Sequence, residues 1–220
     1  MHPVAALIAY FSEEEYGRKE HYLEFRSISD AGRMGAGKPV SVKFIQSLTE
    51  GFAVKSSSVP HGAIPDEMKY ADTREEKYIW HRPPCRKYMY FKKELNIPCG
   101  DCHIPGLVWM VERERLYLFA YKSKRLSSGT QLYAAPFFNV NPDSGSVCLG
   151  NAKLKKPEIL TFLNFLKFWE DMFFLSEFSQ ITGGNPTKQN LVLVIKNSTQ
   201  VFDNEELKSI EKLKFKDLLE

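Results

Sequence analysis

Apolar and polar side chains alternate along residues 21–28, with Leu23 and Phe25 at every second position. This alternation is typical of a strand that buries one face. A glycine-rich segment follows at residues 31–37, and we expect a turn there.

Helical spacing begins soon after this turn. Val42, Ile45 and Leu48 recur at intervals of three residues, which predicts a helix with one apolar face. Pro39 fits the first position of this helix, and Gly51 fits its C-terminal stop.

Short apolar runs separated by turn residues dominate the middle of the chain. Residues 53–76 are rich in serine, proline and glycine, so we expect a long surface connection there. The runs that follow predict an antiparallel meander. Its expected strands are residues 77–81, 86–91, 106–111, 116–121 (joined to the preceding strand by the turn 112–115) and 131–135.

A long helix is predicted over residues 157–179, with Pro157 at its start and the Gly-Gly-Asn-Pro segment 183–186 after its end. It is apolar on most sides, so we expect it to lie across the sheet. Residues 191–195 fit either a strand or a buried turn of helix. An amphipathic C-terminal helix is predicted over residues 204–219.

Composition indicates one core. A chain of 220 residues with 43% hydrophobic and 13% aromatic content is long enough to bury one good-sized core, so we expect a single domain over residues 1–220. The predicted elements place it in the α+β class. Its 30 basic and 27 acidic residues leave a net charge of +3, which does not indicate nucleic acid or an anionic membrane as the main partner.

Targeting signals are not apparent. The apolar run at residues 3–11 lacks a basic leader, so it does not fit a signal peptide. We therefore expect a cytoplasmic protein whose four cysteines are reduced. Residues 159–178 approach membrane length but contain polar residues that are costly in lipid, namely Asn164, Lys167, Glu170, Asp171 and Glu177.

Residues 32–38 fit the first seven positions of a phosphate-binding loop, between a predicted strand and a predicted helix. The eighth position is Pro39, which has neither a hydroxyl for magnesium nor an N–H for a phosphate. No apolar strand ending in aspartate supplies a second magnesium ligand. We therefore favour a plain glycine-rich turn over nucleotide hydrolysis.

The segment Cys99-Gly100-Asp101-Cys102-His103 matches the pattern of covalent haem attachment and offers three zinc ligands. Haem attachment is expected of exported proteins, and no nearby residue completes a zinc tetrahedron. We therefore interpret the segment as a polar turn between two strands, bracketed by Pro98 and Pro105, and predict no metal or organic cofactor.

A second cysteine lies beside a tight turn. Pro142 to Gly145 form a turn cluster between two short apolar runs, with Asn139 before the turn and Cys148 after it. Cys148 is thus a candidate nucleophile and Asn139 a candidate donor to an oxyanion. Alternatively, Cys148 ends a buried strand and Asn139 is an ordinary turn residue, since free cysteine is often buried.

The order of residues at this turn resembles the active-site stretch of ubiquitin-conjugating enzymes, where a His-Pro-Asn tripeptide precedes a Gly-x-Ile-Cys-Leu segment. Here Asn139 precedes Gly145-Ser146-Val147-Cys148-Leu149. The order of predicted elements is also similar. The resemblance implies a ubiquitin-conjugating-like α+β fold with a core at about residues 20–195, a family-specific N-terminal strand, and a C-terminal helical extension at residues 196–220.

A closer resemblance is to a bacterial branch, prokaryotic family D, which includes protein B of the PRTRC system of plasmids and other mobile elements. It implies a thioester relay with a ubiquitin-like protein, a ThiF-type activating-enzyme-like protein and a JAB-type peptidase. The segments that carry it are residues 22–24, 32–37, 60–65, 70–74, 80–84, 135–140, 147–150 and 169–178.

Two departures concern histidines. Phe137 and Phe138 replace the His-Pro pair of the general conjugating-enzyme pattern, as the bacterial branch also does. Gln180 stands where that branch usually has a histidine. Glutamine donates and accepts hydrogen bonds but takes no proton near neutral pH.

The resemblance implies that Cys148, as thiolate, accepts an acyl group and passes it to an amine while Asn139 stabilises the oxyanion. The lysines that follow, Lys153, Lys155 and Lys156, are candidates for positive charge near the thiolate or for a solvated helix approach. The alternative function is a binding module that recognises a ubiquitin-like or plasmid-encoded partner without carrying an acyl group.

Overall fold

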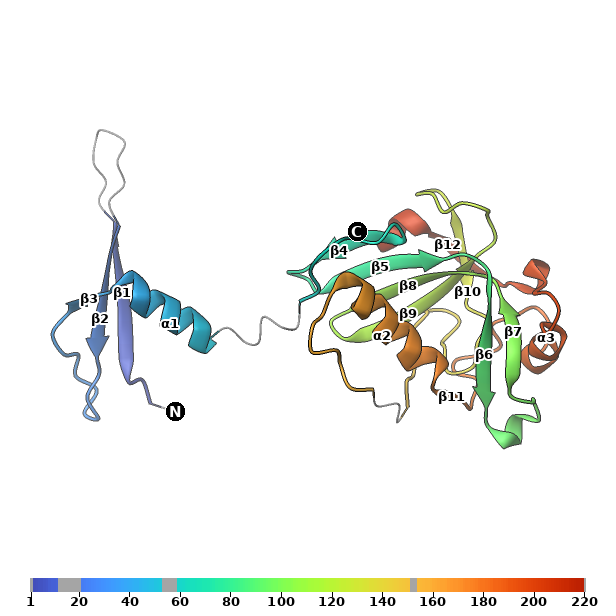
Figure 1. The fold of residues 1–220 in the computed structure, drawn as a ribbon, viewed down its shortest axis with the longest axis horizontal. Coiled ribbons are helices and arrows are strands. Elements are labelled where there is room, and N and C mark those ends of the chain that lie inside the picture. Colours follow the sequence, from blue (N-terminus) through green and yellow to red (C-terminus); the bar gives the residue numbers. More distant parts are fainter. Residues whose placement is uncertain (1, 12–20, 53–58, 151–153, 220) are drawn as a thin grey trace. The chain divides into compact units, whose positions relative to one another are not determined.

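The structure is a computed structural model that describes residues 2–11, 21–52, 59–150 and 154–219. The chain forms two compact units, Met1–Ser56 and Ser57–Glu220. The first unit contains one sheet and the second contains two; Figure 1 shows the strands of each unit.

The N-terminal unit is a small antiparallel sheet with one helix. Its strands pair in the order β1-β2-β3, and the strand expected at residues 21–28 is confirmed. The helix packs on the sheet through Phe44, whose ring lies 5.4 Å from that of Phe25. The elements are β1 (Ala5–Phe11), β2 (His21–Ser27), β3 (Lys38–Pro39) and α1 (Val42–Phe52).

The start of α1 differs from the expectation. Pro39 lies in the edge strand β3, where its missing N–H is tolerated. Ser41 directly precedes the helix, and its Oγ accepts a hydrogen bond from the Phe44 N–H at 3.2 Å, as an N-cap serine does. The helix runs past Gly51, which was expected to stop it, to Phe52.

The second unit is built on a six-stranded antiparallel sheet of order β12-β10-β9-β8-β5-β4. The meander is confirmed for β8, β9 and β10. Strand β4 lies in the segment expected to be a surface connection, whose residues 53–58 fall outside the described ranges. The strands are β4 (Met68–Asp72), β5 (Lys77–Arg82), β8 (Gly106–Glu112), β9 (Arg115–Tyr121), β10 (Gln131–Ala134) and β12 (Ser209–Lys214).

A second sheet, of order β11-β6-β7, interrupts the meander between β5 and β8. Strand β6 (Cys85–Phe91) pairs antiparallel with β7 (Gly100–Ile104) and parallel with the short β11 (Glu177–Phe178). The polar turn expected at residues 99–103 is therefore wrong. This segment forms a strand because its alternate residues Cys102 and Ile104 reach the core.

Helix α2 (Phe162–Phe174) lies across one face of the main sheet, as expected (Figure 1). It is shorter at both ends than the predicted 157–179. Thr161 caps its start by accepting a hydrogen bond from the Asn164 N–H at 3.1 Å. At its end, Ser176 Oγ donates to the Phe173 carbonyl at 2.6 Å, and the chain continues as β11. The helix thus ends well before residues 183–186.

The C-terminal segment corrects another expectation. Residues 191–195, for which strand and helix were both open, form helix α3 (Leu191–Asn197). The helix predicted over residues 204–219 is instead two 3-10 turns, η3 (Asn204–Glu206) and η4 (Phe215–Leu218), around β12. Phe215 and Leu218 are buried in an apolar cluster with Ile79 and Phe119 of the main sheet.

A bulge explains the misleading pattern. The register between β10 and β12 shifts, and Lys212 has φ 58° within β12. Ile210 and Leu213, three residues apart, are both packed against the same cluster. A bulge therefore gives this strand an apolar spacing that resembles that of a helix.

Candidate functional site

The tight turn before Cys148 is confirmed. The N–H of Gly145 donates to the Asn141 carbonyl at 2.9 Å, and the N–H of Asn141 donates to the Ser146 carbonyl at 2.9 Å. Gly145 has φ 71°, and a Cβ there would lie 2.5 Å from the ring of Phe119. Both the backbone angle and the space therefore require glycine at this position.

The thiol of Cys148 lies at the surface. Val140 and Val147 form an isolated antiparallel bridge, and the Cys148 N–H donates to the Asn139 carbonyl at 2.8 Å. Val147 is partly buried while Cys148 is exposed. The alternative that Cys148 is a buried strand end is therefore wrong.

Asn139 connects the cysteine loop to the segment after α2. It is 6% exposed and has φ 61°, a left-handed conformation that asparagine tolerates. Its Oδ1 accepts hydrogen bonds from the Ser179 N–H (3.2 Å), the Ser179 Oγ (3.1 Å) and the Gln180 N–H (3.2 Å). Its Nδ2 donates to the Glu177 carbonyl at 3.0 Å. A carboxamide has two amide protons, so one is left for another acceptor.

An open pocket of about 440 Å³ lies at this junction. The structure thus brings Cys148, Asn139 and Gln180 into the lining of one pocket. The walls of the pocket are formed by the cysteine loop, the end of α2, β11 and the end of β6. The lining residues are Lys92, Asn139, Cys148, Leu149, Gly150, Leu175, Ser176, Glu177, Ser179 and Gln180.

Two charged residues of this pocket, Lys92 and Glu177, were not identified from the sequence. The parallel pairing of β6 with β11 places Tyr90 opposite Glu177. The Lys92 N–H then continues the pairing by donating to the Phe178 carbonyl at 2.9 Å. No local pattern in the sequence signals this contact between distant segments.

Phe137 and Phe138 belong to the core. They are 1% and 0% exposed, and neither lines the pocket. The Phe137 ring lies 5.2 Å from that of Phe173 in α2 and 6.1 Å from that of Phe178 in β11. These residues therefore support the site by packing its loop against α2 and β11, where aromatic pairs add to burial.

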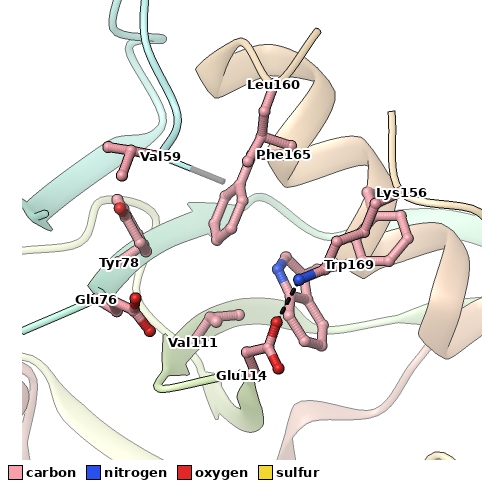
Figure 2. A pocket seen from close by; sticks show the side chains of 10 residues that line it. Val59, Glu76, Tyr78, Val111, Glu114, Lys156, Leu160, Phe165 and Trp169 are labelled. Atoms are coloured by element: carbon pink, nitrogen blue, oxygen red, sulfur yellow. Dashed lines mark hydrogen bonds and ion pairs between the residues drawn. The ribbon is translucent and has the colours of Figure 1, made fainter. Parts of the chain in front are cut away.

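Lys155 and Lys156, two of the three lysines considered after Cys148, are engaged away from its pocket. Lys155 pairs with Glu158 at 3.0 Å, and Lys156 pairs with Glu114; Lys153 lies outside the described residues. Figure 2 shows the Lys156–Glu114 pair beside Trp169 at a separate small cavity of about 60 Å³. Neither Lys155 nor Lys156 lines the Cys148 pocket; among the described lining residues, the cationic one is Lys92.

The cysteine-histidine segment 99–103 and the glycine-rich segment 32–38 both form parts of strands or lead into them. Cys102 is buried, which raises the pKa of its thiol, and the consecutive His103 projects from the opposite side of β7. Among the residues that the structure describes, no three or more His, Cys, Asp or Glu side chains are placed to hold a metal ion. The glycine-rich segment 32–38 leads into β3 rather than directly into a helix.

None of the helices in the described ranges has the length and apolar character needed to cross a membrane.

The family model of prokaryotic E2 family D matches residues 43–210, most of the chain and the whole Cys148 pocket. The protein therefore belongs to prokaryotic E2 family D and has its ubiquitin-conjugating-like α+β fold. Strands β1, β2 and β3 precede the matched residues. Neither a curated protein nor a solved structure matches the chain.

Proposed function

We propose that this protein accepts a ubiquitin-like protein as a thioester on Cys148 and transfers it to an amine. The observation that carries the proposal is the exposed thiol of Cys148 in an open pocket whose two walls are joined by Asn139. Membership of prokaryotic E2 family D supports the class of reaction.

In the first step, the Cys148 thiolate attacks the carbonyl carbon of a thioester between the ubiquitin-like protein and an activating enzyme. A new C–S bond forms and the activating enzyme's thiolate leaves. In the second step, a neutral amine attacks the carbonyl carbon of the Cys148 thioester. The C–N bond forms, the C–S bond breaks so that the Cys148 thiolate leaves, and the nitrogen loses a proton to solvent. The acyl group is already activated, so the site contributes mainly by positioning the reactants.

Asn139 has two roles in this proposal. It fixes the cysteine loop against Ser179 and Gln180, and its remaining amide proton stabilises the oxyanion of each tetrahedral intermediate. Gln180 contributes to this arrangement through its backbone N–H and carbonyl, which any residue except proline supplies. Replacement of the family's histidine therefore leaves the anchoring of Asn139 intact.

The proposed partners follow from the relay. A ThiF-type activating protein charges Cys148, a ubiquitin-like protein is carried, and a JAB-type peptidase of the same PRTRC mobile-element system reverses or processes the product. Because the relay needs a reduced thiol and ATP, we propose that it operates in the cytoplasm. The net charge of +3 gives no reason to add nucleic acid as a partner.

The proposal is tested by incubating the protein with its activating enzyme, ATP and ubiquitin-like partner. We expect an adduct that thiol reductants cleave, which Cys148→Ala does not form. Cys148→Ser should form an ester that survives reductant but not hydroxide. If the wild type forms no adduct yet binds the ubiquitin-like protein, the chain acts as a binding module, and transfer is ruled out.

A further inference from the structure

Lys92 shares the pocket of Cys148. It follows β6 directly, in extended backbone with φ −63° and ψ 139°, and its N–H bonds to the Phe178 carbonyl at 2.9 Å. Its backbone is therefore fixed by the same β6–β11 pairing that places Glu177 in the wall of the pocket. The Lys92 side chain is exposed and lines the open pocket together with Cys148.

Among the residues that the structure describes, no ion pair engages the Lys92 ammonium. Other lysines of the described chain, such as Lys122, Lys155 and Lys156, are held in ion pairs. The next residue, Lys93, is also exposed but does not line the pocket. The two neighbouring lysines thus differ in their access to the thiol pocket.

We propose that Lys92 is a self-modification site, at which its Nζ receives the acyl group carried by Cys148 of the same molecule. This inference rests on the proposed function. An amine and a thioester on one rigid framework react at a high effective concentration, so no separate acceptor has to bind.

The step is an acyl transfer from sulfur to nitrogen. The Lys92 ammonium first loses a proton to solvent, and the neutral amine attacks the thioester carbonyl carbon. The C–N bond forms, the C–S bond breaks, and the electron pair leaves on the Cys148 sulfur. Loss of the second proton from nitrogen yields a neutral isopeptide and a free thiolate.

The isopeptide at Lys92 has a consequence for the site. The attached chain occupies the pocket of about 440 Å³ that Cys148 also lines. A molecule modified at Lys92 is therefore hindered from accepting a second acyl group. Self-modification limits the number of turnovers whenever an external amine is scarce.

A short synthetic peptide with a C-terminal glycyl thioester tests the inference without the activating enzyme. It charges cysteines by thioester exchange, and peptide mapping by mass spectrometry locates each adduct with and without reductant. We expect a reductant-sensitive adduct on Cys148 that converts with time into a reductant-resistant adduct on Lys92. In Cys148→Ala, acylation of Lys92 should fall about tenfold or more, to the level of Lys93.

Lys92→Arg keeps the positive charge but removes the nucleophilic amine, and Lys93→Arg is its matched control. Per mole of Cys148 adduct, the reductant-resistant product should fall about tenfold in Lys92→Arg and stay at the wild-type level in Lys93→Arg. Acylation of Lys92 at an equal rate in wild type and Cys148→Ala overturns the inference. So does a Cys148 adduct that persists without any transfer to Lys92.

The same variants in the complete enzymatic relay separate the two proposals. A reductant-sensitive adduct without a Lys92 product overturns self-modification and leaves the thioester function standing. Absence of any adduct in the relay, with transfer to Lys92 from the synthetic thioester, overturns the proposed function but not the reactivity of the pair.

Discussion

The N–H of Asn139 donates to the Gln180 carbonyl at 2.8 Å, and the N–H of Gln180 donates in return to Oδ1 of Asn139 at 3.2 Å. This reciprocal pair joins the cysteine loop to the segment that follows β11. Cys148 in turn donates its N–H to the Asn139 carbonyl at 2.8 Å. The backbone position of Cys148 therefore depends on a chain of hydrogen bonds that runs through Asn139.

Asn139→Ala is expected to destabilise the fold by about 2–4 kcal/mol, because the buried Asn139 carboxamide makes hydrogen bonds to Glu177, Ser179 and Gln180 that alanine cannot make. It also places an alanine at φ 61°. Asn139→Gly loses the same hydrogen bonds but tolerates this φ, so it should be less destabilising by about 1 kcal/mol. Urea unfolding followed by circular dichroism measures both. Equal unfolding midpoints for the two variants would contradict the backbone argument.

Gln180→Ala should change the free energy of unfolding by less than about 0.5 kcal/mol, since the side chain is exposed and the anchoring atoms are backbone. Gln180→Pro removes the N–H that donates a hydrogen bond to Oδ1 of Asn139. This variant should lower the free energy of unfolding by about 1–3 kcal/mol. Urea unfolding compares the stabilities, and the rate of adduct formation on Cys148 reports the geometry of the site. A loss in the alanine variant as large as in the proline variant would show that the glutamine side chain matters.

Gly145→Ala should destabilise the turn by about 2 kcal/mol or more, because φ is 71° and the added Cβ meets the Phe119 ring at 2.5 Å. Gly150→Ala is the matched control. Gly150 also has a positive φ, 54°, but an added Cβ there meets no described atom within 4 Å. Its cost is then limited to the backbone, about 1 kcal/mol. Thermal unfolding of both variants measures the difference, and equal losses would refute the predicted clash.

The lowered pKa of His81 predicts how the free energy of unfolding changes with pH. Its Nδ1 lies 3.2 Å from the Tyr121 hydroxyl, and burial, with smaller contributions from Lys69 and Arg82 against an opposing one from Glu67, lowers the pKa of His81. The unfolded chain therefore binds a proton more readily than the folded chain does. Stability should decline as the pH falls through the ordinary histidine pKa of about 6.5.

The check is chemical unfolding of wild type and His81→Gln at several pH values between about 8 and 5. The wild type should lose more stability than the variant over this interval, because glutamine does not titrate. Parallel losses in the two proteins would assign the pH dependence to other groups.

Local patterns predicted much of the fold. Strands β5, β8 and β9 and the turn at Gly145 follow from alternation and turn residues, since these depend on neighbours in sequence. The segment 204–219 shows why other predictions were wrong. Its apolar spacing fits a helix, but β10 offers an unpaired edge, and the bulge at Lys212 lets Ile210 and Leu213 face the same cluster.

The sequence by itself determined the turn, the order of Asn139 and Cys148 along it, and the family. The tertiary structure decided which residues share the pocket of Cys148. Lys92 and Glu177 lie in this pocket because β6 pairs in parallel with β11. That pairing consists of backbone hydrogen bonds between segments far apart in the chain. The periodicity of side chains shows which residues share a face of a strand, but it does not show which distant strand lies alongside.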